Sequence, residues 1–295
     1  MRKQILLAFL SLVVAILAII STSIGLFYST DGEPFEFITL HGDSITMYGR
    51  GIYAFDSFFK VPILRGTDAI ILFVVVPYVL LNSFLYMKHS SQINLLFLLS
   101  GLFSILYYAT SITFGVHFNS LYLVYILIFS ASLIGFVWGS SFVDFPLLTK
   151  EVSSKYPYRG VVIFLFIAGC SVFIWLVEII GALATNEIPF GAIGYTTDIT
   201  TVLDLGVIAP LSFITCYLLV KRKPIAFLFA SNLVTLSGFI GLMVIAQTVA
   251  QALEGIILPV GQYVGFVGTF VMLSLFAFSL TIRMYKAFGN NSEQV

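Results

Sequence analysis

Long apolar stretches alternate with short polar ones along almost the entire chain. A helix that crosses a bilayer needs about 20 mostly apolar residues. Eight stretches meet this requirement: Ile5–Phe27, Asp68–Met87, Ile93–Gly115, Leu121–Phe142, Gly160–Thr185, Thr201–Val220, Ile225–Ala250 and Ile256–Ile282. The pattern therefore predicts an all-α polytopic membrane protein with eight transmembrane helices, in which residues 1–295 form a single integral membrane domain.

The basic residues between these stretches predict the orientation of the helices. Lys and Arg are enriched in the cytoplasmic loops of membrane proteins. With the N-terminus in the cytoplasm, eleven of the 14 basic residues lie on the inner side, and Arg50, Lys60 and Arg65 lie outside. Both termini are then cytoplasmic. We expect the first helix to be retained, because its apolar run is long for a cleaved signal peptide.

Two prolines indicate that the chain contains an internal duplication. Pro77 and Pro210 each lie in a helix that runs from the outer to the inner side, and a lysine follows each proline eleven residues later. This match predicts a parallel 4+4 repeat, an arrangement that places sites at the repeat interface in transporters. The halves are residues 1–142, with an extracytoplasmic cap at 29–66, and residues 143–295. A chance alignment of two hydrophobic helices remains the alternative.

The longest polar interruption lies between the first two helices. Apolar and polar residues alternate from Phe35 to Tyr48 around the turn-forming sequence His41-Gly42-Asp43-Ser44, which predicts a small β-hairpin. Aromatic residues are dense in the part that follows, as is usual where a chain contacts the membrane interface. We therefore expect an ordered extracytoplasmic cap whose hairpin folds down over the outer mouth of the helix bundle, near Glu178.

Composition supports the membrane assignment and excludes several functions. Hydrophobic residues make up 59% of the chain and charged residues 9%, whereas a soluble domain has about 25% charged residues. The lipid bilayer is therefore the expected partner, and the net charge of zero gives no reason to expect nucleic acid. The two cysteines lie in apolar stretches, and the sequence contains no hydrolase, zinc-protease or P-loop motif. We expect no cofactor and no metal, and we do not favour an enzyme.

Two short blocks carry a resemblance to a known family. They are Tyr48-Gly49-Arg50-Gly51-Ile52-Tyr53 with the following Asp56-Ser57 and Gly66-Thr67-Asp68, and Asp204-Leu205-Gly206-Val207-Ile208-Ala209-Pro210-Leu211. In these blocks and in its helix layout, the chain resembles a family of uncharacterised bacterial multi-pass membrane proteins with about eight helices. The resemblance implies a location in the bacterial inner (plasma) membrane. It implies no activity and no catalytic residue.

Glu178 is the acid that the pattern places deepest within a span. An acid in a membrane costs several kcal/mol unless it is paired, protonated or in contact with water. Ser171, Trp175 and Ala182 share its helical face, so Glu178 lies on a small and polar stripe. Its role is either a proton, cation or ligand site or a structural hydrogen bond.

Asp68 and Asp204 lie at the predicted outer ends of two helices. Thr201-Val202-Leu203-Asp204 fits the capping box, in which a side chain satisfies free amides at a helix start. Asp68 follows Gly66-Thr67 in a comparable place, so we expect both acids to cap their helices. A cap and a binding site coincide where two helix starts face each other.

Two further sets of polar residues complete the candidates. Gln247, Gln251 and Glu254 recur on one face at the outer end of the seventh helix, and Asp56 is an acid of the cap. The favoured hypothesis is a small-molecule or ion transporter or binding protein with a site in the outer half of the bundle. The ligand- or ion-binding candidates are Glu178, Asp204, Asp68, Asp56, Gln251 and Glu254.

Two alternatives remain. A membrane-embedded enzyme would act on a lipid-type substrate with the outer acids as acid–base groups, although no catalytic motif supports it. A sensor or accessory protein would bind a partner through the outer cap.

Overall fold

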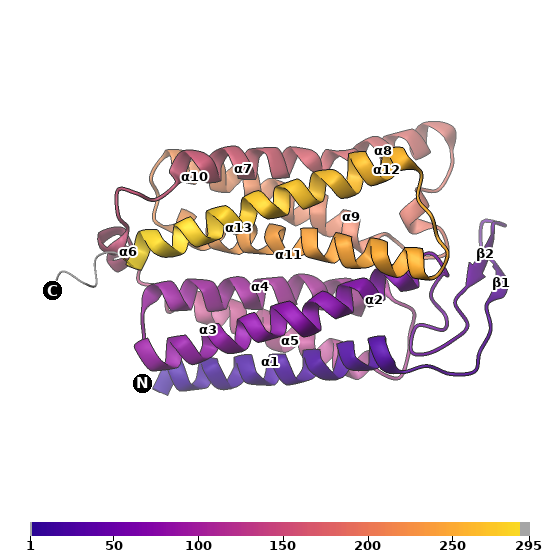
Figure 1. Ribbon diagram of the computed structural model, residues 1–295, viewed down its shortest axis with the longest axis horizontal. Coiled ribbons are helices and arrows are strands. Elements are labelled where there is room, and N and C mark those ends of the chain that lie inside the picture. The colour runs from indigo at the N-terminus through magenta and orange to yellow at the C-terminus, as the bar shows by residue number, and fades with distance from the viewer. Residues whose placement is uncertain (1, 290–295) are drawn as a thin grey trace.

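A computed structural model describes residues 2–289, and within them eight helices are long and apolar enough to cross a membrane. The helices run roughly side by side, α1 begins and α13 ends at one end of the bundle, and the hairpin projects from the other (Figure 1). Six predicted stretches begin and end within a few residues of these helices. The eighth, predicted at Ile256–Ile282, lies at Tyr263–Phe288. The second helix begins at Lys60 rather than at Asp68, so its outer end is about two turns longer than predicted.

The first four long helices, of which the second comprises α2, η1 and α3, form one group in the lower half of Figure 1. In this group α1 packs against α3 and α5, and α4 packs against α3 and α5. The bounds are α1 Arg2–Phe27, α2 Lys60–Ile70, η1 Ile71–Val75, α3 Val76–His89, α4 Gln92–Gly115 and α5 Tyr122–Ser140.

The second group has the same order of neighbours, because α7 packs against α10 and α13, and α11 packs against α10 and α13. The two groups meet where α11 packs against α2 and α4, and where α9 packs against α4. The bounds are α6 Phe145–Glu151, α7 Tyr158–Ser171, α8 Phe173–Thr185, η2 Phe190–Ala192, α9 Ile199–Leu203, η3 Asp204–Ile208, α10 Ala209–Val220, α11 Ile225–Leu253, α12 Val260–Gln262, η4 Tyr263–Val267 and α13 Gly268–Gly289.

Each proline singled out above follows a π-helical turn. The amide of Val76 bonds to the carbonyl of Ile71, and the amide of Ala209 bonds to the carbonyl of Asp204, in both cases five residues back. Proline has no N–H and its ring clashes with the carbonyl four residues before it. The wider turn relieves this clash, so η1 and η3 stand immediately before Val76-Pro77 and Ala209-Pro210.

The predicted hairpin is confirmed. Strands β1 (Phe35–Ile38) and β2 (Ser44–Met47) are antiparallel, with Phe35 opposite Met47 and Ile38 opposite Ser44. The prediction that the hairpin folds down near Glu178 is wrong. All four residues of β1 are exposed, and the hairpin extends away from the helix ends (Figure 1).

The part of the cap that packs on the bundle is the loop after the hairpin. Gly49 and Gly51 adopt positive φ angles of 77° and 67°, which reverse the chain at little steric cost. The turn buries Tyr48 and Tyr53, which are 4% and 2% exposed. These two tyrosines, rather than the hairpin, connect the cap with the helices.

Candidate functional site

Asp68 lies inside a helix and is completely buried, with 0% of its surface exposed. The prediction that it caps the helix is wrong, because α2 begins two turns earlier, at Lys60. Its side chain is therefore free to contact the neighbouring helices.

Two tyrosines hold the Asp68 carboxylate. The Tyr53 hydroxyl donates to Oδ2 at 2.8 Å from the cap, and the Tyr108 hydroxyl donates to Oδ1 at 2.7 Å from α4. Ser21 of α1 lies within hydrogen-bond distance of the Tyr108 hydroxyl, at 3.2 Å. Burial, and then the nearby Asp68 carboxylate, raise the pKa of Tyr53 well above its usual value, so this hydroxyl keeps its proton and donates.

Among the described residues, no ion pair of 4.0 Å or less involves Asp68. Arg65, one turn before Asp68 on α2, interacts electrostatically with the carboxylate but forms no ion pair with it. A buried carboxylate without an ion-paired base is costly as an anion, and hydroxyl donors offset only part of that cost. Such a group gains stability by binding a proton or a cation. Asp68 is thus the kind of buried acid that a bound proton or cation would stabilise.

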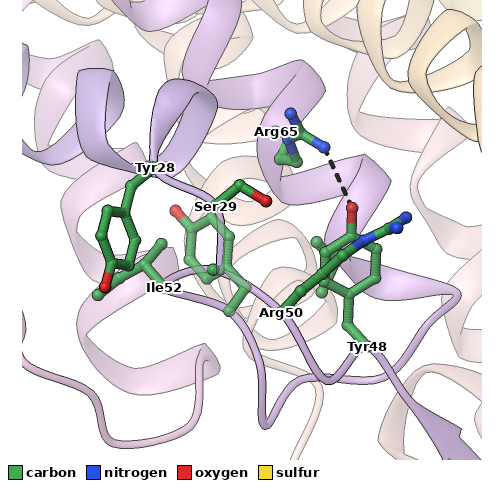
Figure 2. Close-up of a pocket in the computed structure, with 10 residues that line it drawn as sticks. Tyr28, Ser29, Tyr48, Arg50, Ile52 and Arg65 are labelled. Atoms are coloured by element: carbon green, nitrogen blue, oxygen red, sulfur yellow. Dashed lines mark hydrogen bonds between the residues drawn. The ribbon is translucent and has the colours of Figure 1, made fainter. Parts of the chain in front are cut away.

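A small pocket of about 30 Å³ lies between the end of α1, the cap and the start of α2 (Figure 2). Its volume is about that of one water molecule in the liquid. Tyr53, Arg65 and Gly25 line it together with Tyr28, Ser29, Tyr48, Arg50, Gly51, Ile52 and Val61. Tyr53 lines the pocket and its hydroxyl also donates to Asp68, so this buried tyrosine lies between the pocket and the carboxylate.

Gly25 marks the closest approach of α1 to this site. A Cβ atom at this position would overlap Asp68 Oδ2 and lie 3.0 Å from the Tyr53 hydroxyl. Glycine therefore allows the carboxylate and the tyrosine to meet against the helix backbone.

Glu254, one of the predicted candidates, fastens the cap to α11. It pairs with Arg50 at 2.6 Å and with Arg65 at 3.5 Å, and it accepts a hydrogen bond from the Tyr48 hydroxyl at 2.7 Å. Arg65 also donates to the Tyr48 hydroxyl at 3.1 Å (Figure 2). Glu254 is thus already paired with two cations, and we assign it to cap attachment.

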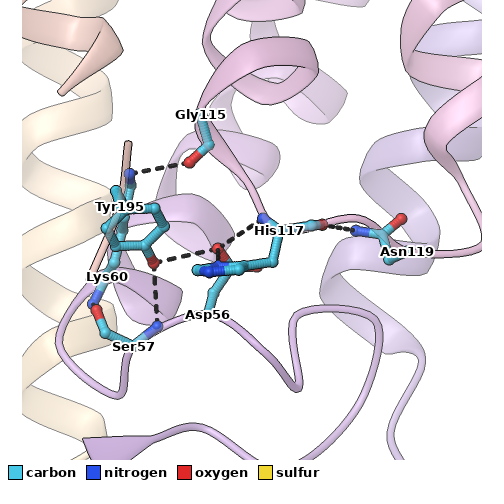
Figure 3. Close-up of polar contacts among 7 residues, drawn as sticks. All are labelled: Asp56, Ser57, Lys60, Gly115, His117, Asn119 and Tyr195. Carbon is cyan, nitrogen blue, oxygen red and sulfur yellow. Dashed lines mark hydrogen bonds and ion pairs between the residues drawn. The ribbon is translucent and has the colours of Figure 1, made fainter. Parts of the chain in front are cut away.

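Asp56 forms a second cluster at the outer end (Figure 3). It is 1% exposed, and its Oδ1 accepts from the backbone amide of His117 at 3.1 Å and from the Tyr195 hydroxyl at 3.1 Å. The His117 Nδ1 lies 3.2 Å from the same oxygen, and Lys60 donates to the Gly115 carbonyl at 2.9 Å. Asp56 Oδ2 has no partner. This cluster joins the cap to the α4–α5 and α8–α9 connections.

The described residues contain no group of three or more His, Cys, Asp or Glu side chains arranged to hold a metal ion. Asp56 and His117 therefore supply too few ligands for a structural zinc site.

Asp204 has surroundings like those of Asp68. It is 7% exposed, it accepts from the Tyr107 hydroxyl at 2.8 Å, and the indole of Trp175 donates to it at 3.2 Å. The predicted capping box is wrong, because Asp198 caps α9 by accepting from the Thr200 amide. Asp204 is instead an interior residue whose carbonyl closes the π turn.

Glu178 and Gln251 occupy other places. Glu178 is half-buried on α8, one turn beyond Trp175 on the same helical face. Gln251 is 4% exposed and its Nε2 has no partner, whereas Gln247, one turn before it, donates to Thr67 at 2.8 Å. The hydrogen-bond partners thus assign Asp68, Asp204, Asp56 and Glu254 to four separate clusters. Asp68 is the one that is completely buried and bonded to a residue of the pocket.

Sequence reasoning missed the aromatic donors. Tyr53, Tyr107, Tyr108 and Trp175 bond directly to the buried acids, and the sequence indicated this role for none of them. The feature of the sequence that could have indicated these donors is the adjacent pair Tyr107 and Tyr108 in the outer half of an otherwise apolar span.

Comparison with protein-family models, with curated proteins and with solved structures found no match for this chain. The functional argument therefore depends on the geometry of the site.

Proposed function

We propose that the chain is a polytopic protein of the bacterial inner membrane, with eight spans, cytoplasmic termini and a parallel 4+4 repeat. The long helices leave large apolar side chains on their outer faces, such as Leu123 at 74%, Val177 at 70% and Leu183 at 75% exposure, as a lipid-facing surface requires. The bias in basic residues supports the orientation. The matching π turns and the matching order of helix neighbours support the repeat.

The function that the geometry supports best is the binding and transport of a small cation, or of a small molecule coupled to one. One observation carries this proposal: Asp68 is a completely buried carboxylate that accepts two hydroxyl hydrogen bonds and forms no ion pair with a described residue, and one of its donors, Tyr53, also lines the outer pocket. Intramembrane acids mark ion pathways and proton relays in many membrane proteins. Asp204 provides a related group in the second half.

Carbodiimide labelling tests the role of Asp68. Dicyclohexylcarbodiimide reacts with protonated carboxyl groups in apolar surroundings, and peptide mass spectrometry locates the adduct. We expect Asp68 to be modified in the full-length protein, and raised pH or one of Na⁺, K⁺ or Mg²⁺ to protect it. Asp144, an exposed cap of α6, is the internal control and should stay unmodified. Failure to modify Asp68 at any pH in the folded protein would contradict the proposal.

The exposed hairpin favours a second candidate function, the recognition of a protein partner outside the cell. Ile38 and Leu40 at its tip are 62% and 103% exposed, and Phe35 and Phe37 of β1 are 42% and 46% exposed. Exposed apolar groups of this kind mark interaction surfaces. Replacing Ile38 and Leu40 with serine should abolish capture of such a partner and leave labelling of Asp68 intact. Unchanged capture would exclude the tip as the contact.

A further inference from the structure

A row of buried polar side chains runs inward from the Asp68 site between α3, α4 and α11. Apart from Tyr78, which is partly buried, each member is at most 5% exposed. We call this row the polar seam; it comprises Tyr108, Ser104, Ser100, Tyr78, Thr235, Asn232, Asn82 and Asn94.

The outer part of the polar seam follows one face of α4. Tyr108, Ser104 and Ser100 are spaced four residues apart, so they cover about 12 Å along the helix at 1.5 Å per residue. Tyr108 donates to Asp68, and the Ser104 hydroxyl donates to the Ser100 carbonyl at 2.8 Å. These three residues thus place polar side chains along the face of α4 that leads from the Asp68 site.

The centre of the polar seam is the contact of Tyr78 with α4 and α11. The Tyr78 hydroxyl lies 2.9 Å from the Ser100 hydroxyl, and Gly101 leaves room for the tyrosine ring against α4. The Thr235 hydroxyl interacts with the Tyr78 hydroxyl, and the Phe239 ring, one turn further along α11, packs edge-on against the Tyr78 ring at 5.2 Å. This face of α11 is therefore turned toward Tyr78.

Asn232 lies one turn from Thr235 on that same face of α11. It is 0% exposed, and neither its amide nitrogen nor its amide oxygen has a hydrogen-bond partner. Leaving such groups unpaired costs about 1–3 kcal/mol each. A metal cation would satisfy the amide oxygen but face the amide N–H groups. Water donates and accepts, so it satisfies all of them.

The inner part of the polar seam leads to the opposite end of the bundle. Asn82 donates to the Tyr78 carbonyl at 2.8 Å, and Asn94, near the start of α4, donates to the Leu85 carbonyl at 3.3 Å. The Asn94 side-chain oxygen has no partner, as in Asn232. Polar groups thus continue across the bundle from Asp68 to the inner end of α4.

We propose that the polar seam carries protons between Asp68 and the inner face, along water molecules bound by Asn232 and Thr235. This inference rests on the proposed function and names its cation. A proton that leaves the Asp68 carboxyl group for the first water is replaced by one that enters through the pocket and the Tyr53 hydroxyl. Buried polar residues in membrane helices usually form hydrogen bonds between helices, and this role leaves their polar groups paired. It does not account for Asn232.

Proton flux into liposomes tests the path. The full-length protein is reconstituted with a pH-sensitive dye inside, and a K⁺ gradient with valinomycin sets the membrane potential. We expect Asn232→Leu and Thr235→Val each to lower the wild-type flux at least ten-fold, and Asp68→Asn to abolish it. Ser237→Ala is the matched control, because the Ser237 hydroxyl already bonds to the Leu233 carbonyl of its own helix.

The outcomes separate the two proposals. Loss of flux in Asp68→Asn with full flux in Asn232→Leu and Thr235→Val would overturn the seam and leave the Asp68 site standing. A wild-type flux equal to that of protein-free liposomes would overturn the proton path, while carbodiimide labelling decides the Asp68 site independently.

X-ray hydroxyl-radical labelling uses the unmodified protein, so its result does not depend on whether a variant folds. This method oxidises buried side chains only where water lies next to them. We expect oxidation of Tyr78 and none of Phe164, which is 0% exposed and packs against Phe276. Unoxidised Tyr78 would contradict a hydrated seam.

Discussion

Tyr107 and Tyr108 are adjacent on α4, yet they donate hydrogen bonds to two different buried acids. Tyr107 bonds to Asp204 of the second group of helices, and Tyr108 bonds to Asp68 of the first. Successive residues of a helix point about 100° apart, so neighbouring side chains reach different partners. One helix between the two groups thus contacts both acids.

The hydrogen bond between Tyr108 and Asp68 should couple the stability effects of substitutions at these two residues. Tyr108→Phe removes one of the two donors of a buried carboxylate and should lower stability by about 1–3 kcal/mol. In a thermal-unfolding mutant cycle, Tyr108→Phe and Asp68→Asn should couple, whereas Tyr107→Phe and Asp68→Asn should be additive. Equal coupling for both tyrosines would refute the separation of the two acids.

Gly25 should not tolerate a side chain. Its Cβ would overlap Asp68 Oδ2, so Gly25→Ala should destabilise the protein by about 1–3 kcal/mol and reduce carbodiimide labelling of Asp68. Gly181→Ala on α8 is the control, because nothing lies within 4 Å of that position, and it should be neutral or slightly stabilising. A Gly25→Ala variant as stable as the control would show that the approach to Asp68 is looser than described.

Glu254 should hold the cap against α11. Glu254→Gln leaves Arg50 and Arg65 without their anion, and hydrogen exchange across residues 48–60 should become at least several-fold faster. Glu187→Gln changes an exposed acid in the α8–η2 connection and should leave this exchange unaltered. If both variants exchange like wild type, the ion pairs contribute nothing to cap attachment.

The hairpin should weaken in acid. Hydrogen bonds from Ser44 and then from Thr46 lower the pKa of Glu36, so their stabilising effect is complete above the unfolded value of about 4.3 and is lost as pH falls through the lower folded value. The amide resonance of selectively labelled Thr46 should titrate with a midpoint below 4.3, and Glu36→Gln should remove the titration. A midpoint at or above 4.3 would contradict these bonds.

The spans and the hairpin could be predicted from sequence because both follow local periodicity. Apolar length identified the helices, and alternation around His41-Gly42-Asp43-Ser44 identified the turn. The start of α2 was placed too late because Lys60 and Arg65 interrupt the apolar pattern, although both find partners in the tertiary structure. A polar residue that is satisfied by distant groups looks like a loop residue in the sequence.

The site itself was harder to predict. Asp68 was a candidate from sequence, but its donors come from residues 15 and 40 positions away. The same applies to Glu254, whose role depends on residues about 200 positions earlier in the chain. Helix capping was inferred for Asp68 and Asp204 from their neighbours in the sequence. In the folded protein both side chains contact other helices instead, so tertiary packing overrode the local pattern.

We propose above all that Asp68, which lies inside the bundle, binds a proton or a cation. Infrared difference spectroscopy of the full-length protein measures this directly, since a protonated carboxyl group in apolar surroundings has its own C=O stretching band. We expect a band that disappears when pH is raised or a coupling cation is added. This band should be missing in Asp68→Asn and should persist in Asp144→Asn. A spectrum of Asp68→Asn identical to that of wild type would contradict this proposal.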